Sequence, residues 1–320
     1  MSLRIGVLGA SRIAEDAIVG PARQLGHRLV AVAARDPLRA SAFADKYGVE
    51  RVLPSYRDVV TDPEVDVVYN PLANALHAPW NLAAVAAGKP VLSEKPFARN
   101  TVEAAQVAAA AQAAGVTVME AFHYLFHPVT RRAFELATDG TLGELTRVEV
   151  RMGMPAPQAA DPRWSLELAG GALMDLGCYG LHIMRRFGEP SVNRATAGER
   201  SPGVDAWCDV ELTFPSGATG LSTNTMEADD YSFTLRVIGT RGEAFVHDFI
   251  KPHHDDRLTV RTHDDTRVEH LGRRPSYTYQ LEAFAAHVQH GAPVPLDTAD
   301  AVANMALVDE AYRAAGLSPR

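Results

Sequence analysis

Short apolar runs alternate with amphipathic stretches along the first third of the chain. The runs have the length and composition of buried β-strands, whereas apolar residues recur at helical spacing in the stretches between them. The predicted strands cover residues 3–8, 28–33, 66–70, 90–93 and 116–120. The predicted helices cover residues 13–25, 38–47, 79–87 and 101–114. This alternation indicates a parallel sheet with helices on both faces.

The pattern changes after about residue 122, where longer β-prone stretches follow one another, separated by turn residues. These stretches cover residues 145–152, 205–214, 218–225, 231–238, 243–247, 257–262 and 266–271. Helical patterns cover residues 128–138, 277–290 and 298–315. We therefore predict two domains, residues 1–121 and 122–320, the second with an antiparallel sheet and helices on one face.

Composition narrows the class of protein. The 320 residues are 47% hydrophobic, carry a formal net charge of -8 and include two cysteines, Cys178 and Cys208. We find no secretion signal, and no apolar stretch approaches the roughly 20 residues of a membrane span. The acidic balance argues against a nucleic-acid partner. We expect a cytoplasmic protein with a small-molecule partner, no membrane partner and no disulfide framework.

The first predicted strand ends in a possible dinucleotide-binding turn. Gly9 supplies a tight turn, Ser11 is small and carries a hydroxyl, and Ala14 permits close packing of helix on strand, so the pattern G-x-S-x-x-A is a weakened fingerprint. The candidates for cofactor binding here are Gly9, Ser11, Arg12 and Ile13. The alternative is an ordinary strand-to-helix corner.

The end of the second strand bears on the choice of cofactor. Sites for NAD usually place a carboxylate there, but this chain has Ala34 followed by Arg35. A guanidinium suits the 2′-phosphate of NADP, so we expect NADP in preference to NAD. The alternative is that Arg35 is solvated and Asp36 only begins the next turn.

A lysine follows the fourth strand, in the sequence Ser93-Glu94-Lys95-Pro96. Lys95 is therefore expected at the carboxyl edge of the sheet, where doubly wound folds bind ligands. An exposed lysine at a strand end is the alternative.

These motifs together resemble the Gfo/Idh/MocA family of oxidoreductases. The segments that carry the resemblance are GVLGASRIA (6–14), NPLANALHAPW (70–80), SEKPFARN (93–100), EAFHYLFHP (120–128) and GGALMDLGCYGLH (170–182). The branch with dimeric dihydrodiol dehydrogenase, xylose dehydrogenase and nucleotide-sugar ketoreductases is most similar. The resemblance implies an α/β fold with a Rossmann domain and a C-terminal α+β domain with a large open antiparallel sheet. It also implies hydride transfer between a nicotinamide and a sugar, polyol or cyclic diol, and a homodimer or homotetramer formed through that sheet.

The resemblance also implies catalytic roles. Lys95 matches the lysine that contacts the reacting hydroxyl, and Tyr179, four residues after Asp175, matches the acid/base residue. A phenol has a pKa of about 10, and a nearby lysine cation lowers it. Asp175 is expected to orient Lys95 or to bind a sugar hydroxyl. His182 is the second acid/base candidate, with packing as its alternative role.

Further candidates are implied around the cofactor and the substrate. The cofactor candidates are Pro71, Leu72, Asn74, His77, Glu94 and Lys95, with turn, helix-start or hydrogen-bonding roles as alternatives. The substrate candidates are Arg163 and Trp164, for which a surface loop is the alternative. The chain departs from its branch at His123, Leu125 and Ala169, where methionine, arginine and glycine are common.

Two other functional classes stay open at this point. The family also includes a non-catalytic nucleotide-binding regulator and glycosidases that retain their nicotinamide. A group of histidines and aspartates in the second domain suggests a metal site, but its spacing matches no zinc pattern, so no metal is expected. Its members are His247, His253, His254, Asp255, Asp256 and His263.

Overall fold

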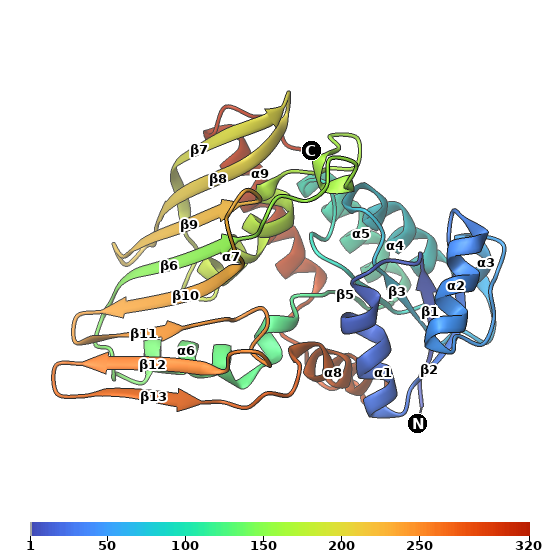
Figure 1. Ribbon diagram of the computed structural model, residues 1–320, viewed down its shortest axis with the longest axis horizontal. Coiled ribbons are helices and arrows are strands. Elements are labelled where there is room, and N and C mark those ends of the chain that lie inside the picture. The colour runs from blue at the N-terminus through green and yellow to red at the C-terminus, as the bar shows by residue number, and fades with distance from the viewer. Residues whose placement is uncertain (1) are drawn as a thin grey trace. The chain divides into compact units, whose positions relative to one another are not determined.

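The computed structural model describes residues 2–320 and divides into two compact units (Figure 1). The first contains the chain up to Phe122 together with Tyr277–Ala303, and the second contains His123–Ser276 together with Asn304–Arg320. The predicted boundary lies between residues 121 and 122, whereas the chain passes from one unit to the other after residues 122, 276 and 303. Hydrophobic periodicity identifies helices near the C-terminus, but it does not show with which earlier segment they pack.

The first unit is built on a parallel five-stranded sheet in the order β2-β1-β3-β4-β5. Its strands are β1 (Arg4–Leu8), β2 (Arg28–Ala33), β3 (Val67–Asn70), β4 (Val91–Ser93) and β5 (Val118–Glu120). All five predicted strands are confirmed. The strand order turns back at β1, which pairs with β2 on one side and with β3 on the other. In such sheets ligands bind beyond the carboxyl ends of the strands at this point.

The helices of the first unit follow the prediction with one addition. They are η1 (Glu15–Val19), α1 (Gly20–Leu25), α2 (Pro37–Tyr47), α3 (Tyr56–Thr61), η2 (Asn74–Leu76), α4 (His77–Ala86), α5 (Thr101–Ala114) and most of α8 (Ser276–His290). The predicted cap of α5 is confirmed, since Asn100 accepts a hydrogen bond from the Glu103 N–H. The short helix α3 was not predicted, although Ser55 caps it in the same way.

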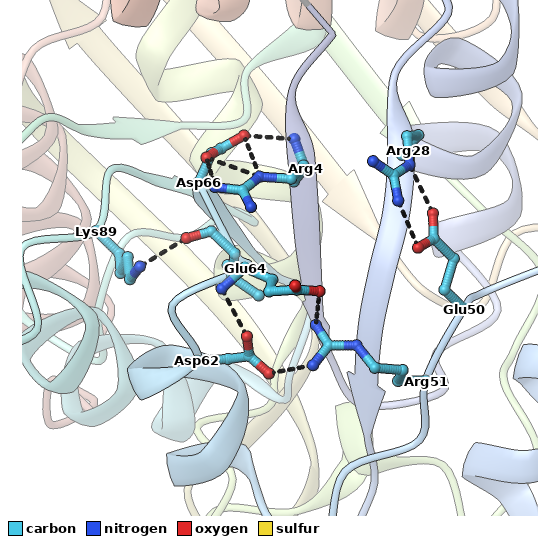
Figure 2. Close-up of polar contacts among 9 residues, drawn as sticks. Arg4, Arg28, Glu50, Arg51, Asp62, Glu64, Asp66 and Lys89 are labelled. Carbon is cyan, nitrogen blue, oxygen red and sulfur yellow. Dashed lines mark hydrogen bonds and ion pairs between the residues drawn. The ribbon is translucent and has the colours of Figure 1, made fainter.

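Ion pairs gather at the amino edge of this sheet, as Figure 2 shows. Arg4 at the start of β1 contacts Asp66 before β3 at 2.7 Å, and Arg28 at the start of β2 contacts Glu50 at 2.7 Å. Lys89 before β4 donates to the carbonyl of Val65 at 2.6 Å. Two of these contacts join the amino ends of neighbouring strands, β1 with β3 and β3 with β4, on the opposite edge from the predicted site.

The second unit contains an eight-stranded sheet in the order β13-β12-β11-β10-β6-β9-β8-β7. Its strands are β6 (Leu145–Gly153), β7 (Ser191–Ser201), β8 (Val204–Thr213), β9 (Thr219–Thr225), β10 (Ser232–Gly239), β11 (Gly242–Val246), β12 (Arg257–Thr262) and β13 (Thr266–His270). The pair β6–β9 is parallel and the other pairs are antiparallel. The prediction of an antiparallel sheet is therefore corrected at that one pair.

Helices cover one face of this sheet. They are η3 (His123–Phe126), α6 (Pro128–Thr138), η4 (Pro162–Trp164), η5 (Leu173–Gly177), α7 (Cys178–Arg185) and the later part of α9 (Thr298–Ala314). The helix α6 packs on β10 to β12, and α7 packs on β6 and β9. Buried residues alternate with half-exposed ones along β9 and β10, so the opposite face is only partly covered. Within residues 2–320, every helix is too short or too polar to cross a membrane.

Candidate active site

The turn after β1 requires glycine at position 9. Gly9 has φ 87°, and a Cβ there would lie 2.9 Å from Cδ2 of Leu72. The Gly9 N–H donates to the carbonyl of Ala33 at the end of β2, at 2.7 Å. The loops after β1, β2 and β3 therefore meet at Gly9, at the point where the strand order turns back. The structure brings together the cofactor candidates Gly9 and Leu72.

Ser11 carries a buried hydroxyl with no hydrogen-bond partner among the described residues. Leaving such a group unpaired is unfavourable by about 1–3 kcal/mol, so positions of this kind commonly receive a ligand atom or water. The neighbouring candidates Arg12 and Ile13 are exposed. A hydroxyl, exposed side chains and a helical start beside a glycine turn suit a dinucleotide pyrophosphate, and the residues present therefore fit this group.

Two guanidinium groups lie near the end of β2. Arg35 is exposed, while Arg39 donates to the carbonyl of Ala10 in the turn after β1, at 2.9 Å. Asp36 caps α2 by accepting from the N–H of Leu38 at 2.9 Å. Its carboxylate is thus used by the helix, whereas Arg35 stays accessible. Arg39 was not among the predicted residues.

A buried amide network joins the ends of β3 and β4. Asn70 donates to Oδ1 of Asn81 at 2.8 Å, and Asn81 donates to Oγ of Ser93 at 2.9 Å. All three side chains are fully buried. The network fixes the loop that begins at Pro71 relative to the segment that carries Glu94 and Lys95. Neither Asn70 nor Asn81 is among the predicted site residues.

His77 connects the same two loops. Its Nδ1 lies 2.7 Å from the carbonyl of Pro96 and its Nε2 lies 2.8 Å from the carbonyl of Leu72. Burial lowers the pKa of His77 to about 4, against the opposing effect of the two carbonyls. At this pKa the ring is neutral at pH 7 and donates to only one of the two carbonyls, which places it against the backbone beside the half-buried Lys95. Asn74, also a cofactor candidate, begins the short helix η2 just before it.

Glu94 has a structural partner. Its Oε1 accepts from the hydroxyl of Tyr69 at 2.9 Å, and both side chains are buried. Burial, and then the Glu94 charge, raise the pKa of Tyr69 well above its ordinary value. The hydrogen-bonding role given as an alternative for Glu94 is therefore present.

In the second unit, two glycines position the segment that carries Asp175 and Tyr179. A Cβ at Gly170 would overlap the carbonyl of Arg163, and one at Gly171 would overlap the carboxylate of Asp205 in β8. The Asp205 carboxylate accepts from the N–H of Leu173 at 2.6 Å. Because these contacts need glycine, the double glycine anchors the start of η5 on β8. The preceding Ala169 has φ 58°, a conformation that glycine adopts more readily.

Arg163 is paired with two carboxylates. Its Nε lies 2.6 Å from Asp175 and its Nη1 lies 3.2 Å from Asp161. The charge of Asp175 is the largest influence that raises the pKa of Arg163. Trp164 donates to the carbonyl of Pro157 at 3.2 Å. Roles of Asp175 and Arg163 towards substrate stay predictions, and the structure adds their mutual ion pair.

His182 is fully buried, with a partner on each ring nitrogen. Its Nδ1 lies 2.7 Å from the hydroxyl of Tyr124 and its Nε2 lies 3.3 Å from Nη2 of Arg186. Because arginine only donates, Nε2 accepts, and the neutral ring carries its proton on Nδ1. These contacts correspond to the packing role that the sequence left open.

Tyr179 lies near the start of α7 with 5% of its surface exposed. Its hydroxyl is 3.3 Å from Nε2 of His123, whose Nδ1 is 2.8 Å from Oγ of Ser276. In the sequence, His123 stands out only as a departure from the branch, and Ser276 belongs to no motif. Their distance along the chain from Tyr179 leaves no local signal for this contact.

The group of histidines and aspartates considered for metal binding is used in other contacts. Asp255 pairs with Arg257 at 2.6 Å, and Asp256 lies 3.0 Å from Nδ1 of His270. His247 is 2.8 Å from the hydroxyl of Thr259. Over residues 2–320, no three metal-ligating side chains of the His, Cys, Asp or Glu type gather in one place.

A surface depression of about 620 Å³ lies in the second unit, beside α6 and the end of α7. Its lining includes Arg131, Phe134 and Arg186, and it contains none of the predicted site residues. The depression approaches the candidate catalytic groups of this unit only through Arg186, which contacts His182.

Family models match both units. Residues 3–122 match the model described as "Oxidoreductase family, NAD-binding Rossmann fold", and residues 130–245 match the GFO/IDH/MocA C-terminal domain. The chain belongs to the Gfo/Idh/MocA oxidoreductase family. The predicted family, fold class, NAD(P)-dependent dehydrogenase or reductase class and nicotinamide dinucleotide cofactor are therefore confirmed.

Named relatives cover between three quarters and nearly all of the chain. D-xylose 1-dehydrogenase (NADP(+)) 2 of Haloferax volcanii is 36% identical over 98% of this chain and 97% of its own length. Trans-1,2-dihydrobenzene-1,2-diol dehydrogenase of Mus musculus is 35% identical over 76% of this chain and 74% of its own. The crystal structure of KijD10, a 3-ketoreductase from Actinomadura kijaniata in complex with NADP and TDP-benzene, has a TM-score of 0.91 and 26% identity, covering 98% of both chains.

Proposed function

We propose that this family member transfers a hydride between NADP and a carbinol or ketone carbon of a sugar, polyol or cyclic diol. The observation that carries the proposal is the match of both units to one oxidoreductase family, together with named relatives that act on xylose, on a dihydrodiol and as a 3-ketoreductase. These relatives favour an active enzyme over a regulator or a glycosidase.

The first unit would hold the dinucleotide. Backbone groups at Gly9, Ser11, Arg12 and Ile13 would receive the pyrophosphate, with the buried Ser11 hydroxyl as one donor. The exposed Arg35 would bind the 2′-phosphate, beside an Arg39 that is already held on the same turn. Pro71, Leu72, Asn74 and His77 would form the loop beside the nicotinamide. When bound, the nicotinamide accepts or gives the hydride.

Tyr179 and Lys95 are proposed as the acid/base pair. In oxidation, Oη of Tyr179 takes the proton of the reacting hydroxyl as the hydride leaves the carbon, and in reduction the same oxygen returns it. The ammonium of Lys95 stabilises the negative charge that develops on the two oxygens. In support, KijD10 has been solved with a lysine and with a tyrosine replaced, and these two residues are separated by as many positions as Lys95 and Tyr179.

Substitution of both residues tests this assignment. Lys95→Ala and Tyr179→Phe should each lower turnover on the order of 10²-fold or more, measured by nicotinamide absorbance with NADP and a panel of aldoses, inositols and cyclic diols. The double variant should lose little beyond the single ones, because the two groups serve one proton transfer. The exposed Tyr231→Phe is the matched control. Unchanged turnover in both single variants would end the assignment.

A second copy of the chain is proposed to cover the open face of the eight-stranded sheet. Half-exposed apolar side chains stand on this face among charged ones, including Phe245, Leu221 and the more exposed Trp207. Light scattering should give a dimer or tetramer, and Phe245→Lys with Leu221→Lys should lower the mass, whereas Leu38→Lys on α2 should not. A monomeric native protein would contradict this arrangement.

A cytoplasmic location is proposed from the two buried thiols, Cys178 and Cys208.

A further inference from the structure

A histidine lies between the proposed catalytic tyrosine and a buried serine. The hydroxyl of Tyr179 is 3.3 Å from Nε2 of His123, and Nδ1 of His123 is 2.8 Å from Oγ of Ser276. His123 and Ser276 are fully buried. The 3.3 Å contact between Tyr179 and His123 has the length typical of catalytic hydrogen bonds before substrate binds.

The chemistry of the three groups limits how the protons are placed. A phenolate only accepts, so a hydrogen bond to ionised Tyr179 requires the proton of neutral His123 to be on Nε2. The Nδ1 atom then accepts, and the hydroxyl of Ser276 can donate to it. One arrangement of protons therefore satisfies the histidine and supports the negative charge on the phenolic oxygen.

We propose that His123 is a positioning residue that holds Oη of Tyr179 and, as the Nε2–H tautomer fixed by Ser276, donates to the phenolate. This proposal rests on the role of Tyr179 given above. His123 stays neutral throughout. The proton passes between the substrate hydroxyl and Oη of Tyr179, and Oη exchanges it with solvent between turnovers. Methionine is common at this position in the branch that the chain resembles, and its side chain has no N–H or O–H donor. The hydrogen bond from His123 to Tyr179 therefore depends on a residue in which this chain departs from that branch.

Other groups around His123 and Tyr179 also influence the charge on Tyr179. A chain of contacts runs from Tyr179 to Tyr124, His182 and Arg186. Asp175 precedes Tyr179 by four residues and is paired with Arg163. Arg186 is hydrogen-bonded to His182, and Arg163 is paired with Asp175. Substitution of His123 leaves these contacts in place, so a change in the ionisation of Tyr179 would report on His123.

Three variants separate hydrogen bonding from packing. His123→Met removes the donor with a side chain of similar bulk, His123→Gln keeps an N–H donor, and Ser276→Ala removes the group that fixes the tautomer. We expect the midpoint pH for ionisation of Tyr179 to rise by about one unit or more in His123→Met. The rise should be smaller in Ser276→Ala and smallest in His123→Gln.

Tyrosinate absorbance of the protein without cofactor or substrate measures this directly, with Tyr179→Phe identifying the signal. The acidic limb of the kcat/KM profile should shift in parallel, while NADPH binding, followed by fluorescence, should stay unchanged as a control for folding. An unshifted Tyr179 titration in His123→Met would overturn the proposal. Because this titration needs no turnover, its result is independent of whether Tyr179→Phe abolishes catalysis.

Discussion

Arg35 and Arg39 place two guanidinium groups beside the turn that follows β1. Charged hydrogen bonds to phosphate contribute about 1.5–3 kcal/mol, so Arg35→Ala should weaken NADP binding by roughly 10- to 150-fold. The effect on NAD should be small because it has no 2′-phosphate. Isothermal titration with both cofactors measures the difference, and Arg35→Lys, which keeps the charge, should recover part of the affinity. Equal losses for NADP and NAD would refute the phosphate role.

Residues with a local signal could be predicted from the sequence, whereas partners distant in the chain could not. Gly9 and Ser11 belong to a turn with a short motif, and Asn100 has its partner three residues away. Ser276 is 153 residues from His123, and the contact of Asn70 with Asn81 depends on how β3 and α4 pack. Such contacts arise from tertiary packing, for which one sequence contains no periodic signal.

At the scale of elements, the packing of η5 on β8 gives a stability prediction. Gly171 combines φ 124° with close approach to Asp205, so Gly171→Ala should lower the free energy of unfolding by about 2–5 kcal/mol. Gly217→Ala is the control, because it has φ 87° but open space around it, and should lose only about 1–2 kcal/mol. Urea unfolding measures both. Equal losses would mean that the contact with Asp205 is unimportant.

Two elements that the sequence missed, β7 and α3, lack hydrophobic periodicity. The edge strand β7 is mostly exposed and polar, and therefore shows no alternation of apolar residues. The helix α3 has six residues, too few for a helical period to emerge. The parallel pair β6–β9 follows from which strands become neighbours after folding, and strand patterns alone do not encode neighbours.

At the scale of the whole molecule, residues 277–303 return to the first unit after the sheet of the second is complete. The helical pattern of this segment was predicted, but such a pattern does not show with which unit a helix packs. Family membership, by contrast, followed from motifs spread along nearly the whole chain, because their order is a property of the sequence itself.

The stability of the first unit should fall in acid because His77 is buried. The pKa of His77 is about 4 in the folded chain and 6.5 in its ordinary range, so the unfolded chain binds the proton first as pH falls. Its contribution to stability is therefore complete above about pH 6.5 and is lost towards pH 4, amounting to about 3 kcal/mol. Burial likewise lowers the pKa of His127 in the second unit to about 4.

Urea unfolding at intervals between pH 7.5 and pH 4 tests this, with the two units followed separately where their transitions differ. His77→Gln should be less stable than the native protein at pH 7.5, because it loses the ring contacts with Leu72 and Pro96, yet lose less stability on acidification. His127→Gln should flatten the pH dependence of the second unit only. If the free energy of unfolding of His77→Gln fell with pH as steeply as that of the native protein, the ring of His77 would not be the group that titrates. The loop before Lys95 would then be held by other contacts.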